Sequence, residues 1–227
     1  MARTLHEKDF TLEQYEDFYE SHYFQPVSDD QALNAHRIFP RVAWALDVAK
    51  EVRPRSVLDI GCLEGYAVLT IANHVDSVEH GVGVDLSEDG IRLAEQRAET
   101  SKLPVHFHQG AIEDFLKNCD EEFDLILMFE VIEHVKNPVH VLDLIDRVKS
   151  KSGTVLISTP DFEAPTFGKD DEQNKCHIRL YTTADEDYEA TNKYGTVRKA
   201  TSLSKQIGKS RVKEMEVVSE LINCRYV

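Results

Sequence analysis

Two glycines, Gly61 and Gly65, stand in a tight turn between an apolar segment of strand length and an apolar segment with a helical pattern. Glycine suits such a turn because it adopts positive φ angles and lets a ligand approach the backbone. A helix that begins directly after a strand also points backbone N–H groups and the positive end of its dipole at one spot. We therefore expect free N–H groups and a polar ligand at this turn.

A second segment that ends in an acid follows the glycine turn. Residues 81–87 read G-V-G-V-D-L-S, and Asp85 lies 26 positions after Asp59. In doubly wound α/β folds, an acid at the end of the second strand accepts hydrogen bonds from ribose hydroxyls, which predicts an adenosine-type ligand. The nicotinamide fingerprint G-x-G-x-x-G is absent, because Leu63 and Tyr66 occupy two of its glycine positions. This argues against a dehydrogenase.

Residues 130–134, E-V-I-E-H, carry a third group of reactive side chains. On a helical turn, offsets of three and four place Glu130, Glu133 and His134 on one face. Two carboxylates and an imidazole in this arrangement suit either a divalent cation or an acid–base pair.

The elements that must position these side chains alternate between strand and helix. Strands are predicted at 56–60, 80–85, 105–109, 123–129 and 154–158, and helices at 66–74, 88–101 and 139–149. This alternation predicts a mostly parallel α/β sheet with helices on both faces. Two further strand candidates, 196–203 and 212–222, would supply an antiparallel edge. Before the sheet, 31–52 reads as a long helix that Pro40 should kink or divide.

Three motifs within residues 57–182 resemble those of class I S-adenosylmethionine-dependent methyltransferases. They are D-I-G-C-L-E-G-Y, V-G-V-D-L-S and F-D-L-I-L-M-F-E-V-I-E-H-V, in the family's order and approximate spacing. The resemblance implies a Rossmann-like sheet with an antiparallel edge strand, and S-adenosylmethionine as the cofactor. Two positions depart from the pattern: Leu63 stands where many members carry glycine, and Ala111 where an acid often follows the glycine equivalent to Gly110.

The same resemblance implies which residues contact the cofactor. The loop after the first strand would hold the methionine part, the end of the second strand the ribose, and the residues after the third strand the adenine. The end of the fourth strand would pass beneath the sulfonium. In that order, these residues are Asp59, Gly61, Cys62, Leu63, Glu64, Gly65 and Tyr66; Asp85 and Leu86; Ala111 and Ile112; and Phe129 and Glu130.

E-V-I-E-H resembles two branches of the family, the ubiquinone-biosynthesis O-methyltransferases and the small-RNA terminal 2′-O-methyltransferases. In the second branch, the two acids and the histidine bind a metal together with another histidine after the fifth strand. The corresponding set for Mg or Mn here is Glu130, Glu133, His134 and His177. Similar sequences also occur in methyltransferases that use no metal, so His134 or His177 could instead be a general base for a hydroxyl proton.

Composition narrows the class of protein further. The chain has 227 residues, of which 41% are hydrophobic and 30% charged, as in globular proteins. Its four cysteines form no C-x-x-C pair, so neither a zinc site nor a disulfide framework is indicated. No apolar run approaches the roughly 18 residues of a membrane span, and a signal-peptide core is missing, so we expect a cytoplasmic protein.

We expect a helical cap or lid over 1–53 and an S-adenosylmethionine-binding methyltransferase domain over 54–227. The expected acceptor is a small molecule, methylated on oxygen. One alternative is an RNA-end 2′-O-methyltransferase that uses a divalent metal; a basic stretch over 193–213 favours it, and the net charge of −15 opposes nucleic-acid binding. The other alternative is a non-catalytic S-adenosylmethionine-binding module that acts through a partner.

Overall fold

The computed structural model describes residues 26–159 throughout and, outside this range, only five short strands. These are β1 (Arg3–Thr4), β7 (Arg179–Leu180), β8 (Glu189–Asn192), β9 (Gly195–Lys199) and β10 (Val217–Ile222). The predicted cap over 1–53 is therefore described from residue 26 onward, apart from β1, which pairs with β7 in antiparallel orientation.

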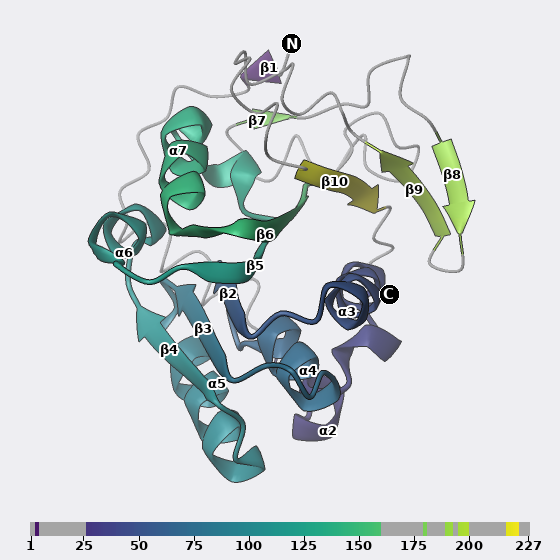
Figure 1. Ribbon diagram of the computed structural model, residues 1–227, viewed down its shortest axis with the longest axis vertical. Helices are drawn as coiled ribbons and strands as arrows, with labels where there is room; N and C mark the ends of the chain where they lie inside the picture. Colours follow the sequence, from purple (N-terminus) through teal and green to yellow (C-terminus); the bar gives the residue numbers. More distant parts are fainter. Residues whose placement is uncertain are drawn as a thin grey trace.

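Five parallel strands form the centre of the fold (Figure 1). In spatial order they are β4 (Val105–Gln109), β3 (His80–Asp85), β2 (Ser56–Ile60), β5 (Phe123–Phe129) and β6 (Lys149–Ser158). The register pairs Ile60 with both Val84 and Met128, and Phe129 with Ser158. All five carboxyl ends thus meet at one edge of the sheet, which is where ligands of open α/β sheets bind.

Helices cover both faces of this sheet (Figure 1). One face carries α3 (Pro40–Val52), α4 (Tyr66–His74) and α5 (Glu88–Ser101), and the other carries α6 (Ile112–Asn118) and α7 (Pro138–Val148). The short α2 (Asp29–Leu33) and η1 (Ala35–Arg37) pack beside α4, while η2 (Ile132–His134) follows β5. None of the described helices is long and apolar enough to cross a membrane.

Each face of the sheet has its own buried cluster. Leu127 of β5 packs with Trp44 of α3 in one cluster, and the next residue, Met128, packs with Leu144 of α7 in the other. Successive side chains of a strand point to opposite faces, so a central strand covered on both sides must be apolar nearly throughout. This explains the continuous apolar run of β5.

Most predicted bounds agree with the structure. Pro40 divides the predicted helix, as expected, by standing at the first position of α3, where its missing N–H costs nothing. Other elements differ. The short helix α6 was not predicted. Helix α7 ends at Val148 rather than at 149, and β6 begins at Lys149 rather than at 154. The β6 register is irregular opposite Phe123 and Leu125, which accommodates the extra residues at its start.

The Rossmann-like α/β fold is confirmed, whereas an antiparallel edge is not seen in the sheet of residues 26–159, whose strands are all parallel. Among the short strands beyond this range, β10 pairs in parallel with β6, and β9 pairs in antiparallel orientation with β10 and β8. The residues that connect these strands lie outside the described part of the chain. The antiparallel edge strand therefore stays a prediction.

Candidate active site

The turn between β2 and α4 contains three residues with left-handed backbone, Gly61 (φ 72°), Leu63 (φ 47°) and Gly65 (φ 74°). A Cβ on Gly61 would overlap the Val131 side chain, and one on Gly65 would lie 2.7 Å from the Phe107 ring. Both glycines are therefore required by the backbone conformation and by the side chains that pack against them. Leu63 adopts the same region at a conformational cost that its surroundings must offset.

Three backbone N–H groups of this turn are used within the protein. Those of Gly61 and Cys62 both donate to the Val84 carbonyl, at 2.8 and 3.1 Å. That of Leu63 donates to Asp85 Oδ2 at 2.8 Å. The expectation of free N–H groups is therefore wrong for these three residues, because the turn closes on the neighbouring strand β3.

Asp59 and Asp85 are the carboxylates at the ends of β2 and β3. Burial raises the pKa of Asp59 from 3.8 to about 7, although its Oδ2 accepts the Val68 N–H at 3.2 Å. Burial also raises the pKa of Asp85, and the hydrogen bonds it accepts from the Ser87 and Leu63 N–H groups, at 2.9 and 2.8 Å, oppose this shift. A carboxylate oxygen accepts more than one hydrogen bond, so Asp85 retains capacity for ribose hydroxyls.

Arg41 of α3 lies beside the glycine turn and was not among the predicted residues. Its Nη2 donates to the Tyr66 hydroxyl at 2.7 Å, and its guanidinium lies 5.0 Å from the centre of the Phe39 ring, which stacks on Tyr66. Arg41 also lowers the pKa of Asp59, against the larger effect of burial. Sequence spacing carried no signal for this cation, because α3 and α4 meet only in the folded chain.

Three other predicted cofactor residues have side chains engaged with the protein. Cys62 belongs to a hydrophobic cluster, and burial raises the pKa of its thiol. Phe129 is buried, with its ring centre 6.3 Å from that of Trp44. Glu64 is 3% exposed and pairs with Arg97, with 2.8 Å between Oε2 and Nη1. Any contact of Cys62 or Glu64 with a ligand would therefore be through the backbone.

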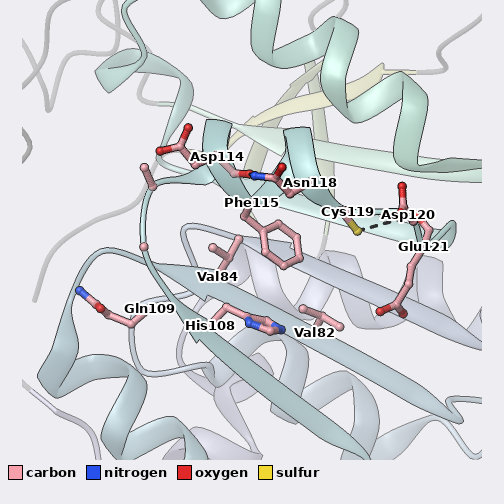
Figure 2. A pocket seen from close by; sticks show the side chains of 12 residues that line it. Val82, Val84, His108, Gln109, Asp114, Phe115, Asn118, Cys119, Asp120 and Glu121 are labelled. Atoms are coloured by element: carbon pink, nitrogen blue, oxygen red, sulfur yellow. Dashed lines mark hydrogen bonds between the residues drawn. The ribbon is translucent and has the colours of Figure 1, made fainter.

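Ala111 and Ile112 lie at the start of α6, next to a groove of about 600 Å³ between α6 and strands β3 and β4. Figure 2 shows His108 and Phe115 within this groove, and their ring centres are 5.2 Å apart. Ala111 lines the groove, whereas Asp59 does not. The groove therefore touches the predicted adenine end of the site, and no residue of the glycine turn lines it. Leu86 lies nearby, and its carbonyl accepts a hydrogen bond from Gln109 Nε2 at 3.1 Å.

The acids after β5 point at the end of β6. Glu130 has left-handed backbone (φ 57°), and its Oε1 accepts a hydrogen bond from Ser158 Oγ at 2.6 Å. Glu133 is 2% exposed and accepts a hydrogen bond from Thr159 Oγ1 at 3.2 Å. His134 Nε2 lies 4.0 Å from Glu133 Oε1. The prediction that Glu130 shares a helical turn with Glu133 and His134 is wrong, because only Ile132–His134 are helical.

The proposed metal ligands are only partly described. Among the residues that the structure describes, no group of three or more His, Cys, Asp or Glu side chains could hold a metal ion. His177, the fourth predicted ligand and second candidate base, lies outside the described residues. The metal set therefore stays a prediction.

A family model described as a methyltransferase domain matches residues 53–217. The chain belongs to this methyltransferase family. It is a class I S-adenosylmethionine-dependent methyltransferase domain, and the family implies binding of S-adenosylmethionine or S-adenosylhomocysteine. The matched range contains every predicted site residue, from Asp59 to His177.

Curated relatives of this methyltransferase include two enzymes named ubiquinone biosynthesis O-methyltransferase. The protein from Glaesserella parasuis is 31% identical over 64% of this chain and 61% of its own length, and that from Methylococcus capsulatus is 30% identical over 58% of this chain and 54% of its own length. The chain thus spans about three-fifths or less of these relatives. The solved YcgJ protein of Bacillus subtilis has the same fold, with a TM-score of 0.51 and 22% identity over 63% of this chain and 62% of its own.

Proposed function

We propose that this methyltransferase transfers the methyl group of S-adenosylmethionine to an oxygen of a small-molecule acceptor. The observation that carries the proposal is the contact between its two reactive turns. Val131, within E-V-I-E-H, fills the space that a Cβ on Gly61 would occupy. The glycine turn and the acid–histidine turn are therefore adjacent, as a cofactor site and an acceptor site must be for direct transfer.

The residues around the glycine turn fit the chemistry of S-adenosylmethionine. Asp59 suits the ammonium of the methionine part, Arg41 suits its carboxylate, and Asp85 suits the ribose diol. When bound, this cofactor supplies a methyl group on a positively charged sulfur. In our proposal Gly65 and Tyr66 border the methionine part, whereas Ala111 and Ile112 border the adenine. The 1–53 segment is proposed to cap this edge of the sheet.

Methylation of a hydroxyl requires that the acceptor oxygen lose its proton. We assign this proton to His134, because a neutral imidazole is a natural acceptor for a hydroxyl proton near neutral pH. Glu133, with Oε1 4.0 Å from Nε2, would stabilise the imidazolium that results. His177 is the alternative base in this proposal.

Two observations favour a small acceptor and transfer to oxygen. The curated relatives are named O-methyltransferases, and the net charge of −15 repels a phosphate backbone. The RNA-end alternative rests on the metal set and on the basic stretch over 193–213, most of which lies outside the described residues.

The proposal is tested by calorimetric titration with S-adenosylmethionine and S-adenosylhomocysteine, followed by turnover on separate panels. The panels contain phenols and aliphatic alcohols, amines, thiols, and short RNA with a free terminal 2′-hydroxyl, each with and without Mg²⁺ or Mn²⁺. We expect binding of both nucleosides and release of S-adenosylhomocysteine with the hydroxyl panel. Turnover confined to amines, thiols or RNA would refute the acceptor class, and tight binding without any turnover would favour the non-catalytic alternative.

The ribose assignment predicts a large effect of Asp85→Ala. Removing the carboxylate leaves the ribose diol without its acceptor, at a cost of roughly 1–3 kcal/mol in binding, or about 5- to 150-fold in Kd. It also removes the acceptor of the Leu63 and Ser87 N–H groups, so the melting temperature should fall. Unchanged affinity in a folded variant would remove Asp85 from the site.

A further inference from the structure

A buried ion pair joins the glycine turn to α5 and to the chain that precedes α2. Arg97 of α5 is 2% exposed, and its Nη1 lies 2.8 Å from Glu64 Oε2 and 3.3 Å from the Glu64 carbonyl oxygen. The same guanidinium donates to the Val27 carbonyl through Nη2 and to Asp29 Oδ1 through Nε, the latter at 3.1 Å. Glu64 Oε1 in turn accepts the Val27 N–H at 3.2 Å. Both backbone polar groups of Val27 are therefore bound to this pair.

Because Glu64 lies within the glycine turn, these contacts also restrain the backbone of the turn. Its neighbours Leu63 and Gly65 have left-handed backbone, with φ angles of 47° and 74°. Arg97 fixes Glu64 through both the side chain and the carbonyl, so it restrains the backbone between these two residues. The turn is thus held on one side by Asp85 and on the other by Arg97.

The segment after Val27 is also seated on the methyltransferase core. Thr70 of α4 accepts the Ala35 N–H at 3.0 Å and donates to the Ala32 carbonyl at 3.0 Å. The chain from Val27 to Ala35 therefore packs on α4, which begins at the glycine turn. Burying two charges brings little net stability compared with apolar residues of similar volume, so the pair suggests a role other than raising stability.

We propose that Glu64 and Arg97 are positioning residues that couple the conformation of the glycine turn to the attachment of the N-terminal segment at Val27. The coupling rests on the proposed binding of the cofactor at this turn. Because coupling free energies are reciprocal, a nucleoside that orders the turn also strengthens the Val27 attachment, and loss of that attachment weakens nucleoside binding by the same factor.

Amide hydrogen exchange at Val27 tests the coupling directly in the full chain. Saturating S-adenosylhomocysteine should slow exchange of the Val27 amide by about 10-fold in the wild type, within the usual range of coupling energies. Glu64→Gln should remove this response. A wild-type protein that binds no nucleoside would refute the cofactor assignment. A wild-type protein that binds S-adenosylhomocysteine with no change in Val27 exchange would overturn the coupling alone.

A pair of variants separates positioning from stability. Arg97→Met leaves Glu64 buried without its partner and should lower the melting temperature strongly, and it can fail to fold. The double variant Glu64→Leu/Arg97→Met removes both charges and should recover most of the melting temperature. Its S-adenosylhomocysteine affinity should stay about 10-fold below that of the wild type, because the turn and Val27 are no longer joined. Recovery of affinity along with stability would overturn the proposal.

The exposed pair Arg55–Glu79 provides a matched control. Arg55 Nη2 lies 2.6 Å from Glu79 Oε2, but the two side chains are 73% and 62% exposed. Arg55→Met removes an Arg–Glu pair of similar length without touching the turn. It should change neither nucleoside affinity nor Val27 exchange. A change as large as that of the double variant would show that the effect is not specific to Glu64 and Arg97, and would overturn the proposal.

Discussion

The turns after β2 and β5 lie side by side but are stabilised in different ways. The glycine turn has three left-handed residues, and its N–H groups donate to β3. The turn after β5 has one left-handed residue, Glu130, and its carboxylates accept hydrogen bonds from the hydroxyls of Ser158 and Thr159. The first turn combines left-handed backbone with hydrogen bonds to β3 and to Arg97, whereas the second is anchored by hydroxyl side chains at and just after the end of β6.

The proposed site has a cofactor half at the glycine turn and an acceptor half at the turn after β5, and the two differ in the same way. The residues that shape the cofactor half lie within 26–159 and complete one another's hydrogen bonds. The acceptor half adjoins Thr159, the last residue of the continuously described range. Changes around the glycine turn should therefore act on cofactor affinity, and changes around the turn after β5 should act on turnover. Four experiments test this difference between the two turns.

The largest expected effect lies in the acceptor half. His134→Gln removes the proposed base and should lower kcat by about 100-fold or more, the usual contribution of a general base. The Kd for S-adenosylhomocysteine should stay within about twofold, because the glycine turn is untouched. Steady-state kinetics and calorimetry measure the two effects. His140→Gln, an exposed position on α7, is the control. Equal losses in both variants would exclude His134 as the base.

Gly65→Ala should disrupt the glycine turn and destabilise the protein. Its Cβ would lie 2.7 Å from the Phe107 ring at a φ of 74°, so overlap and backbone strain together should cost about 3 kcal/mol of unfolding free energy. Gly110→Ala shows backbone strain without overlap, because Gly110 has a φ of 150° and no atom lies within 4 Å of its Cβ position. Urea unfolding measures both variants. A loss from Gly65→Ala of only about 1–2 kcal/mol, the cost of left-handed backbone alone, would show that packing against Phe107 is unimportant.

The cofactor half should also respond to pH through Asp59. An ammonium favours the ionised carboxylate, so S-adenosylhomocysteine affinity should rise about 10-fold between pH 6 and 8 as Asp59, with a pKa of about 7, ionises. The same raised pKa stabilises the folded protein below pH 4, and this contribution, at most about 4 kcal/mol, is lost as pH rises to 7. Calorimetry of Asp59→Asn should show a flat profile. An unchanged profile would assign the titration elsewhere.

The smallest expected effect tests the side-chain anchoring after β5. Ser158→Ala removes the hydroxyl that lies 2.6 Å from Glu130 and should cost about 1 kcal/mol of stability and a few-fold in kcat. Cofactor affinity should not change. Ser150→Ala removes a similar hydroxyl–carboxylate hydrogen bond, of 3.0 Å to Asp124, at the other end of β6, and should reduce stability without reducing kcat. Thermal melts and kinetics of both variants distinguish the two roles.

The sheet and the positions of the turns after β2 and β3 could be predicted because their signals are local. Residues 80–85 and 88–101 were predicted with the bounds that the structure has, since an apolar strand, the Ser87 cap and an amphipathic helix follow one another directly. The region after β5 was predicted less well. E-V-I-E-H has helical spacing, but the left-handed backbone at Glu130 and its hydrogen bond to Ser158 break that spacing.

Local sequence signals were sufficient to predict the alternation of strands and helices apart from α6, the glycines of the first turn and the acid that ends β3. These follow from hydrophobic periodicity and backbone sterics, which act over a few residues. Three contacts depend on the tertiary structure: Glu64 pairs with Arg97, Arg41 lies beside Tyr66, and Glu133 accepts a hydrogen bond from Thr159. The partner of a buried charge depends on which segments pack together, and these segments lie far apart in the sequence.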